Sequence, residues 1–125
     1  MRETKQTKGS MEAELSRALT QWEKEYLGRG SVSVKTDILR DMIIVVLKGI
    51  LTPAEYKLCD TKEGILSLKR IRCDLVETGR DQLDQLIEEI TGEKVTSFHT
   101  DISTRAGERV MIFRLSSNIQ KELQS

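Results

Sequence analysis

One short stretch, His99-Thr100-Asp101, holds the residues best suited to acid–base chemistry. His99 is the only histidine among the 125 residues, and Asp101 follows it two positions later. Because alternate residues of a strand share a face, both side chains would point the same way on a regular strand. Asp101 could then accept a hydrogen bond from the imidazole and orient it as a base. The alternative is a polar pair on a solvated face or at a subunit contact.

The neighbouring residues extend this candidate recognition segment without completing a catalytic set. Ser97, Ser103 and Thr104 carry available hydroxyl groups, which in strands and turns usually satisfy backbone groups instead. Thr100 and Ser103 are counted among the candidate recognition residues. Arg105 follows in a predicted turn, and together with Lys35 it could contribute to a cationic fringe at the hairpin ends. Such a fringe would suit a carboxylate, bicarbonate, phosphate or acidic protein patch. Acidic side chains, among them Asp37, could equally neutralise it through salt bridges.

The segment has a partial repeat earlier in the chain. Lys35-Thr36-Asp37-Ile38 shares its last three residues with His99-Thr100-Asp101-Ile102. This pattern suggests a quasi-repeat, although strand chemistry alone can produce so short a match. We therefore include Lys35 and Asp37 among the candidate recognition residues.

Metal and cofactor chemistry lack support in the sequence. A single histidine with Asp101, or with the remote Asp37, gives no recognised ligand spacing. Nucleotide-binding glycine loops, the G-x-S-x-G nucleophile elbow and the H-E-x-x-H metalloprotease motif are also missing. Cys59 and Cys73 fall in one predicted helix, where the rise per residue separates them by about 21 Å, beyond disulfide reach. We expect reduced thiols, no metal, no cofactor and no enzymatic activity.

Composition narrows the class of partner. Twenty basic and twenty acidic residues cancel, whereas a general polyanion binder is expected to carry excess positive charge. We therefore expect no nucleic-acid partner. The longest apolar run, Met42 to Leu47, is far shorter than the roughly 20 residues of a membrane span, and the start of the chain lacks an apolar signal core. These features predict a cytoplasmic protein without a transmembrane segment, able to dock on a membrane protein.

The apolar periodicity predicts the elements that position the candidate segment. A helix should begin at the cap Ser10 and end near Gly28, followed by strands over 30–38 and 42–47. Thr52-Pro53-Ala54-Glu55 is a capping-box helix start, and helical spacing then continues to Gly92. A continuous helix of that length would measure about 58 Å, so it must bend near Gly64 or Gly79 or project beyond the domain.

Two further strands, over 94–103 and 109–116, complete the prediction. The element order is α-ββ-α-ββ, which indicates an α+β fold with a mainly antiparallel four-stranded sheet and a long central helix. We expect a flexible tail over 1–9, one domain over 10–117, and a terminal tail or short helix over 118–125.

The strand that begins at Met42 is apolar on both faces, so both should be covered. Either the first helix covers the second face or a second subunit does. This double burial, together with the overlong helix, predicts a homodimer.

The chain resembles the MpsC-like family, named for a Na⁺-translocating membrane-potential-generating system and formerly a domain of unknown function. The resemblance lies in three segments and runs from about residue 11 to 115. They are Leu51-Thr52-Pro53-Ala54-Glu55, Leu86-Ile87-Glu88-Glu89-Ile90-Thr91-Gly92, and Ser97 to Thr104 with Gly107-Glu108. Thr100 stands where the family is expected often to have serine, a conservative change.

The resemblance implies a small accessory or regulatory protein of a membrane-potential-generating or inorganic-carbon-uptake system, whose membrane subunits would be its partners. The alternative from the residues themselves is a small-molecule or anion sensor that uses His99, Asp101 and Arg105.

Overall fold

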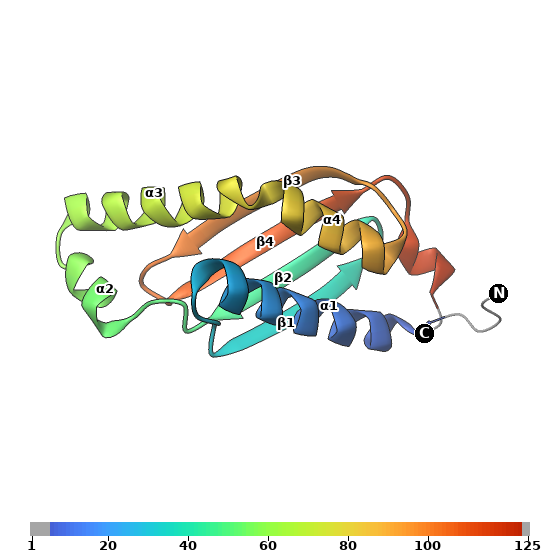
Figure 1. Cartoon of the computed structure of the whole chain (residues 1–125), viewed down its shortest axis with the longest axis horizontal. Helices are drawn as coiled ribbons and strands as arrows, with labels where there is room; N and C mark the ends of the chain where they lie inside the picture. The colour runs from blue at the N-terminus through green and yellow to red at the C-terminus, as the bar shows by residue number, and fades with distance from the viewer. Residues whose placement is uncertain (1–5, 124–125) are drawn as a thin grey trace.

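Two antiparallel hairpins form one four-stranded sheet in the computed structural model, which describes residues 6–123 (Figure 1). The predicted α+β class and the α-ββ-α-ββ order are confirmed. The elements, in chain order, are α1 (Lys8–Trp22), the π-helical turn η1 (Glu23–Leu27), β1 (Ser33–Leu39), β2 (Met42–Lys48), α2 (Pro53–Leu58), α3 (Lys62–Thr78), α4 (Arg80–Thr91), β3 (Val95–Ser103), β4 (Glu108–Leu115) and the 3₁₀ helix η2 (Ile119–Glu122).

The sheet has the strand order β1-β2-β4-β3, and every neighbouring pair is antiparallel. The hairpins β1–β2 and β3–β4 therefore meet through their second strands. A half-turn about an axis normal to the sheet, between β2 and β4, exchanges β1 with β3. The quasi-repeat follows this exchange, because Lys35 lies in one row with Asp101 and Asp37 lies in the next row with His99.

Helices α1, α3 and α4 all cover the same face of the sheet (Figure 1). Polar contacts agree, since the hydroxyl of Ser16 on α1 donates to Thr36 on β1, and Arg109 on β4 donates to the Arg72 carbonyl on α3. Of the two alternatives for covering the second face of β2, coverage by the first helix is therefore wrong. Side chains that are almost fully buried between the layers include Leu15, Leu19, Ile43, Val45, Val76, Leu83, Ile87 and Phe113.

The predicted long central helix is three separate helices. Chain direction changes after Leu58, where Thr61 caps a new helix through a hydrogen bond from the Gly64 amide, and again at Gly79. Gly79 lies so close to Trp22 that a Cβ atom would approach the indole to 2.8 Å. The break after Leu58 therefore has a local cap, whereas the break at Gly79, one of the two glycines near which a bend was predicted, is packed against Trp22. Cys59 therefore lies at the end of α2 and Cys73 lies on α3, so the prediction that one helix holds both is wrong. Both cysteines are free thiols.

The ends of the chain also differ in detail from the sequence-based boundaries. Thr7, not Ser10, caps α1 by accepting a hydrogen bond from the Ser10 amide, whereas Gly28 ends the helical segment with a left-handed φ of 86° as expected. Residues 1–5 of the predicted tail lie outside the described residues. The 3₁₀ helix η2 falls within the terminal segment over 118–125.

Gly64 yields a prediction that reverses the usual helix rule. A Cβ atom there would overlap the carbonyl oxygen of Leu58, which ends α2. Although alanine normally favours helices, we expect Gly64→Ala to lose about 1–3 kcal/mol of unfolding free energy, because the turn between α2 and α3 must open. Gly9→Ala on α1 is the matched control: its Cβ meets nothing within 4 Å, so stability should hold or rise. Urea unfolding measures the stability of both variants. If Gly64→Ala is more stable than wild type, the close approach of Gly64 to the Leu58 carbonyl is contradicted.

Candidate functional site

The face of the sheet that the helices leave uncovered, the open face, carries the predicted polar pair. Its centre is a stripe of half-buried apolar side chains on the two middle strands β2 and β4, namely Met42, Ile44, Val46, Val110 and Ile112. Apart from the exposed Leu39 on β1, mainly charged or polar side chains occupy the outer strands on the same face. The predicted alternation of β3 is confirmed, because Ile102 faces the core while His99 and Asp101 are exposed.

His99 and Asp101 line a shallow hollow of about 180 Å³ together with Val110 and Ile112. Asp101 contacts the backbone amide of Ile102 at 2.8 Å and the ammonium of Lys69 at 3.3 Å. The hydrogen bond from the Ile102 amide lowers the pKa of this carboxyl; burial acts to raise it, and contacts with Lys69 help to keep it below its ordinary value. Within the described chain no hydrogen bond joins His99 to Asp101. The aspartate therefore does not orient the imidazole as a catalytic dyad would require.

Thr100, between them, points to the opposite face. Its hydroxyl accepts a hydrogen bond of 2.8 Å from Arg109, inside the protein. Thr36, its counterpart in the quasi-repeat, likewise faces the helices and accepts from the Ser16 hydroxyl at 2.8 Å. Both threonines of the repeat thus accept hydrogen bonds on the helix-covered face of the sheet.

The other predicted recognition residues lie apart from the pair. Ser103 accepts a hydrogen bond from the Ala106 amide and so supports the hairpin turn. Arg105 lies exposed in that turn, beyond the end of β3 at Ser103. At the usual rise per residue, Ser103 is about 13 Å from His99 along the strand. Lys35 and Asp37 are exposed on β1, three strand spacings or about 14 Å from β3. The seven candidate residues therefore do not converge on one ligand-sized site.

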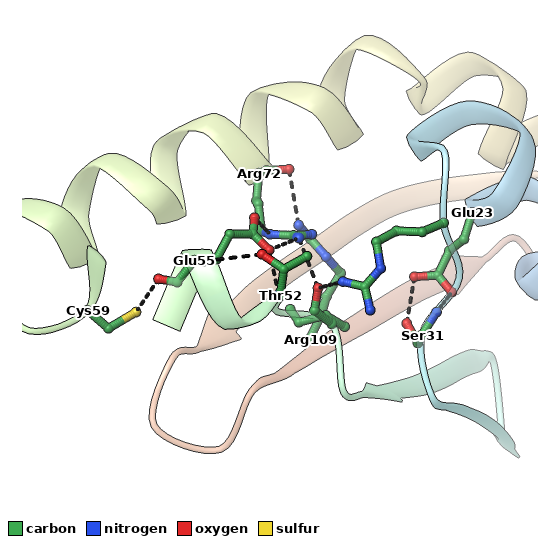
Figure 2. A network of polar contacts seen from close by, with 9 residues as sticks. Glu23, Ser31, Thr52, Glu55, Cys59, Arg72 and Arg109 are labelled. Carbon is green, nitrogen blue, oxygen red and sulfur yellow. Dashed lines mark hydrogen bonds and ion pairs between the residues drawn. The ribbon is translucent and has the colours of Figure 1, made fainter. Parts of the chain in front are cut away.

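A buried polar network under the helices was missed by the sequence-based prediction (Figure 2). Its centre is Arg109, only 3% exposed, which donates to Thr100 and to the backbone carbonyl of Arg72. Arg72 in turn forms a two-pronged ion pair with Glu55 at 2.8 and 3.0 Å. A signal for Arg109 was present: it shares the inward-facing side of β4 with Met111 and Phe113, where a charge needs interior partners.

Glu55 connects this network to the start of α2. Its side chain accepts from the Thr52 amide while the Glu55 amide donates to the Thr52 hydroxyl, so the predicted capping box is confirmed. Burial acts to raise the pKa of Glu55, but the hydrogen bonds from Arg72 and Thr52 outweigh it and lower that pKa. Burial lowers the pKa of Arg109. The carboxylate and both guanidinium groups are thereby committed to interior contacts.

A cavity of about 250 Å³ opens beside this network, between η1, α2 and α3. Two carboxylates and two guanidinium groups line it, those of Glu23, Glu55, Arg29 and Arg72. Glu23, 5% exposed, accepts from the amide and hydroxyl of Ser31 (Figure 2). Arg29 donates to the Ile50 carbonyl. Since the opposite charges balance, the lining gives an anion no advantage over a cation.

The part of the chain that the structure describes contains neither a metal-binding cluster nor a membrane-spanning helix. Over residues 6–123, no group of three or more histidine, cysteine, aspartate or glutamate side chains is placed to hold a metal ion. Each of the described helices is too short or too polar to cross a membrane.

The arrangement defines a small α+β protein whose single sheet has one helix-covered face and one open face. The chain belongs to the MpsC family, whose model, described as "Na+-translocating membrane potential-generating system (MpsC)", matches residues 7–117. It is also similar to a Bacillus subtilis (strain 168) protein named "Uncharacterized protein YbcI", with 65% identity over 120 residues that cover 96% of this chain and 97% of the relative. No solved structure gives a significant match.

Proposed function

We propose that this protein is a non-enzymatic, cytoplasmic accessory or regulatory component of a Na⁺ membrane-potential-generating system, and that it acts as a homodimer. The observation that carries the proposal is the family match over residues 7–117, which takes in nearly every described element. A role assigned to the family therefore concerns this whole domain rather than one motif within it.

The interior polar groups support a role other than catalysis. Glu55 is held by Arg72 and by its capping box, and Glu23 is held by Ser31. A general acid or base must instead exchange its proton with a substrate within hydrogen-bond reach. His99 is exposed, and it lies on the opposite face of the sheet from these groups. Among the described residues, His99 is thus separated by the sheet from the interior carboxylates Glu23 and Glu55.

The open face supports a role in binding. Half-buried apolar side chains on β2 and β4 form a continuous stripe on a sheet face that none of the described helices covers. Contiguous apolar surface of this kind is typical of contacts between proteins. The anion-sensing alternative fits less well, because Arg105 lies far from the His99–Asp101 pair.

Co-purification tests the proposal. An affinity-tagged full chain, produced together with the membrane subunits of the system from the same genome, should retain those subunits after detergent extraction. The matched control is an unrelated tagged protein of similar size and near-zero net charge, which should retain none. Loss of Na⁺-dependent membrane potential when the gene is deleted, restored by the full chain, is the expected functional result. The proposal would be overturned if the deletion strain kept its Na⁺-dependent membrane potential and the tagged chain captured no membrane subunit.

A further inference from the structure

Charged and polar side chains flank the apolar stripe of the open face, with Lys35 and Asp101 of opposite sign. The strand register places Lys35 and Asp101 at the two ends of one cross-strand row, and Asp37 and His99 at the ends of the next. We propose that the open face is the interface of the homodimer, with two copies packed face to face about a two-fold axis parallel to the strands. This inference rests on the dimer proposed above and names the surface that forms it.

The apolar stripe supplies the centre of such an interface. Ile44 and Ile112 are direct neighbours in one row, as are Val46 and Val110 in the next, and all four are half-buried in the single chain. A strand that is apolar on both faces, as β2 is, is typical of a sheet covered twice. Two sheets packed face to face at about 10 Å would bury these side chains between them.

The charges indicate a second copy rather than another partner. A copy turned over about an axis parallel to the strands reverses the order β1-β2-β4-β3. Lys35 then lies opposite Asp101 of the partner subunit, and Asp37 lies opposite His99 of the partner subunit. The same rotation brings Lys48, whose cross-strand neighbour is Glu108, opposite Glu108 of the partner subunit. Two-fold symmetry forms each contact twice.

Several of these charges lack partners within the described chain, although Asp101 already contacts Lys69 at 3.3 Å. Among the described residues, Lys35, Asp37, Lys48 and Glu108 form no ion pair. By contrast, Arg114 on the same face is neutralised by Asp41 at 2.8 Å. Nucleic acid or an anionic lipid surface would select a face of one positive sign. Charges of both signs instead favour a surface that carries the complementary charges, which the open face itself does.

The size of the face sets the expected strength. Four strands of seven residues measure about 19 by 23 Å, or roughly 450 Å² on each copy before side-chain relief is counted. That area lies near the small end of specific interfaces. We therefore expect a dissociation constant of roughly 1–100 µM, so that dimer and monomer interconvert with concentration.

Sedimentation equilibrium of the full chain over about 1–300 µM tests the interface. Wild type should change from monomer to dimer, whereas Ile112→Glu should stay monomeric because it places a charge in the apolar centre. Leu66→Glu, at a position 59% exposed on α3, is the matched control and should dimerise as wild type. A wild type that remains monomeric throughout, or a dimer that only Leu66→Glu disrupts, would overturn the proposal.

A second pair of variants needs no change in the apolar centre. His99 is exposed, so neither substitution there should unfold the chain. His99→Lys, opposite Asp37 of the partner subunit, should tighten the dimer about 3–10-fold, and His99→Asp should weaken it by a similar factor. Shifts in the same direction, or none, would contradict this geometry. The co-purification experiment, repeated with Ile112→Glu, distinguishes the two proposals. If this monomeric variant still retains the membrane subunits, the accessory function does not depend on the dimer.

Discussion

Replacing Phe113 with alanine is expected to lower the free energy of unfolding by about 3–5 kcal/mol. The side chain has no exposed surface and lies in the middle of the helix-covered face, on the central strand β4. Its ring packs against Phe98 on β3 with the centroids 4.8 Å apart. Truncation would remove this contact and leave a cavity that the surrounding strands and helices cannot close. Urea unfolding, followed by circular dichroism, measures the loss.

Phe98→Ala is the matched control for that experiment. Phe98 is the partner ring, but it lies on the edge strand and is only half-buried, with the Arg80 guanidinium 5.1 Å above its face. Because water and Arg80 can occupy part of the space it leaves, we expect a loss roughly half as large. An equal or smaller loss for Phe113→Ala would contradict the assignment of Phe113 to the centre of the core.

The two hairpins were predictable because their physics is local. Alternation along β1, the apolar run of β2, and the Gly107 turn before β4 each specify a strand or its end within a few residues. Gly107 shows why: it adopts a left-handed φ of 64°, and a side chain there would also overlap the Tyr56 hydroxyl. Since neighbouring strands joined by short turns must be antiparallel, the sheet class followed.

The breaks between α2, α3 and α4 could not be predicted with the same certainty. Helical spacing of apolar residues continues through Leu58 and Gly79, so periodicity alone favours one helix. What ends α2 is a competition between helix propagation and the new cap at Thr61, and what bends the chain at Gly79 is its fit against Trp22. The Thr61 cap is local, but its competition with helix propagation is not decided by periodicity, whereas the fit of Gly79 against Trp22 depends on segments distant in sequence. Gly79 was nevertheless one of the two glycines near which a bend was predicted.

The same division applies to the candidate site. The shared direction of His99 and Asp101 followed from strand period, but their separation from Arg105 and Lys35 depends on strand order. The capping-box motif predicted the local role of Glu55 from the sequence. Its ion pair with Arg72 on another helix could be recognised only from the folded structure. The charge complementarity of the open face likewise appears only when the register aligns Lys35 with Asp101 across four strands.

Arg109→Met is expected to lower the free energy of unfolding by about 2–4 kcal/mol. Methionine fills much of the same volume, so the loss comes mainly from hydrogen bonds rather than from a cavity. The Thr100 hydroxyl would lose its donor and the Arg72 carbonyl would lose one of its contacts, each in a water-poor interior. Burying a guanidinium is itself unfavourable, and its removal offsets part of this loss. Urea unfolding of the variant gives the net value.

A double-mutant cycle separates the contribution of Thr100 from that of Arg109. Thr100→Val keeps the shape of the side chain but removes the acceptor, and alone it should cost about 1 kcal/mol. Because the two side chains share one hydrogen bond, the losses of Arg109→Met and Thr100→Val should fall short of additivity by about 0.5–1.5 kcal/mol in the double variant. Thr36→Val, whose hydroxyl contacts Ser16 instead, should be additive with Arg109→Met. Additive losses for Thr100 as well would contradict its structural role and leave this threonine of the repeat free for recognition.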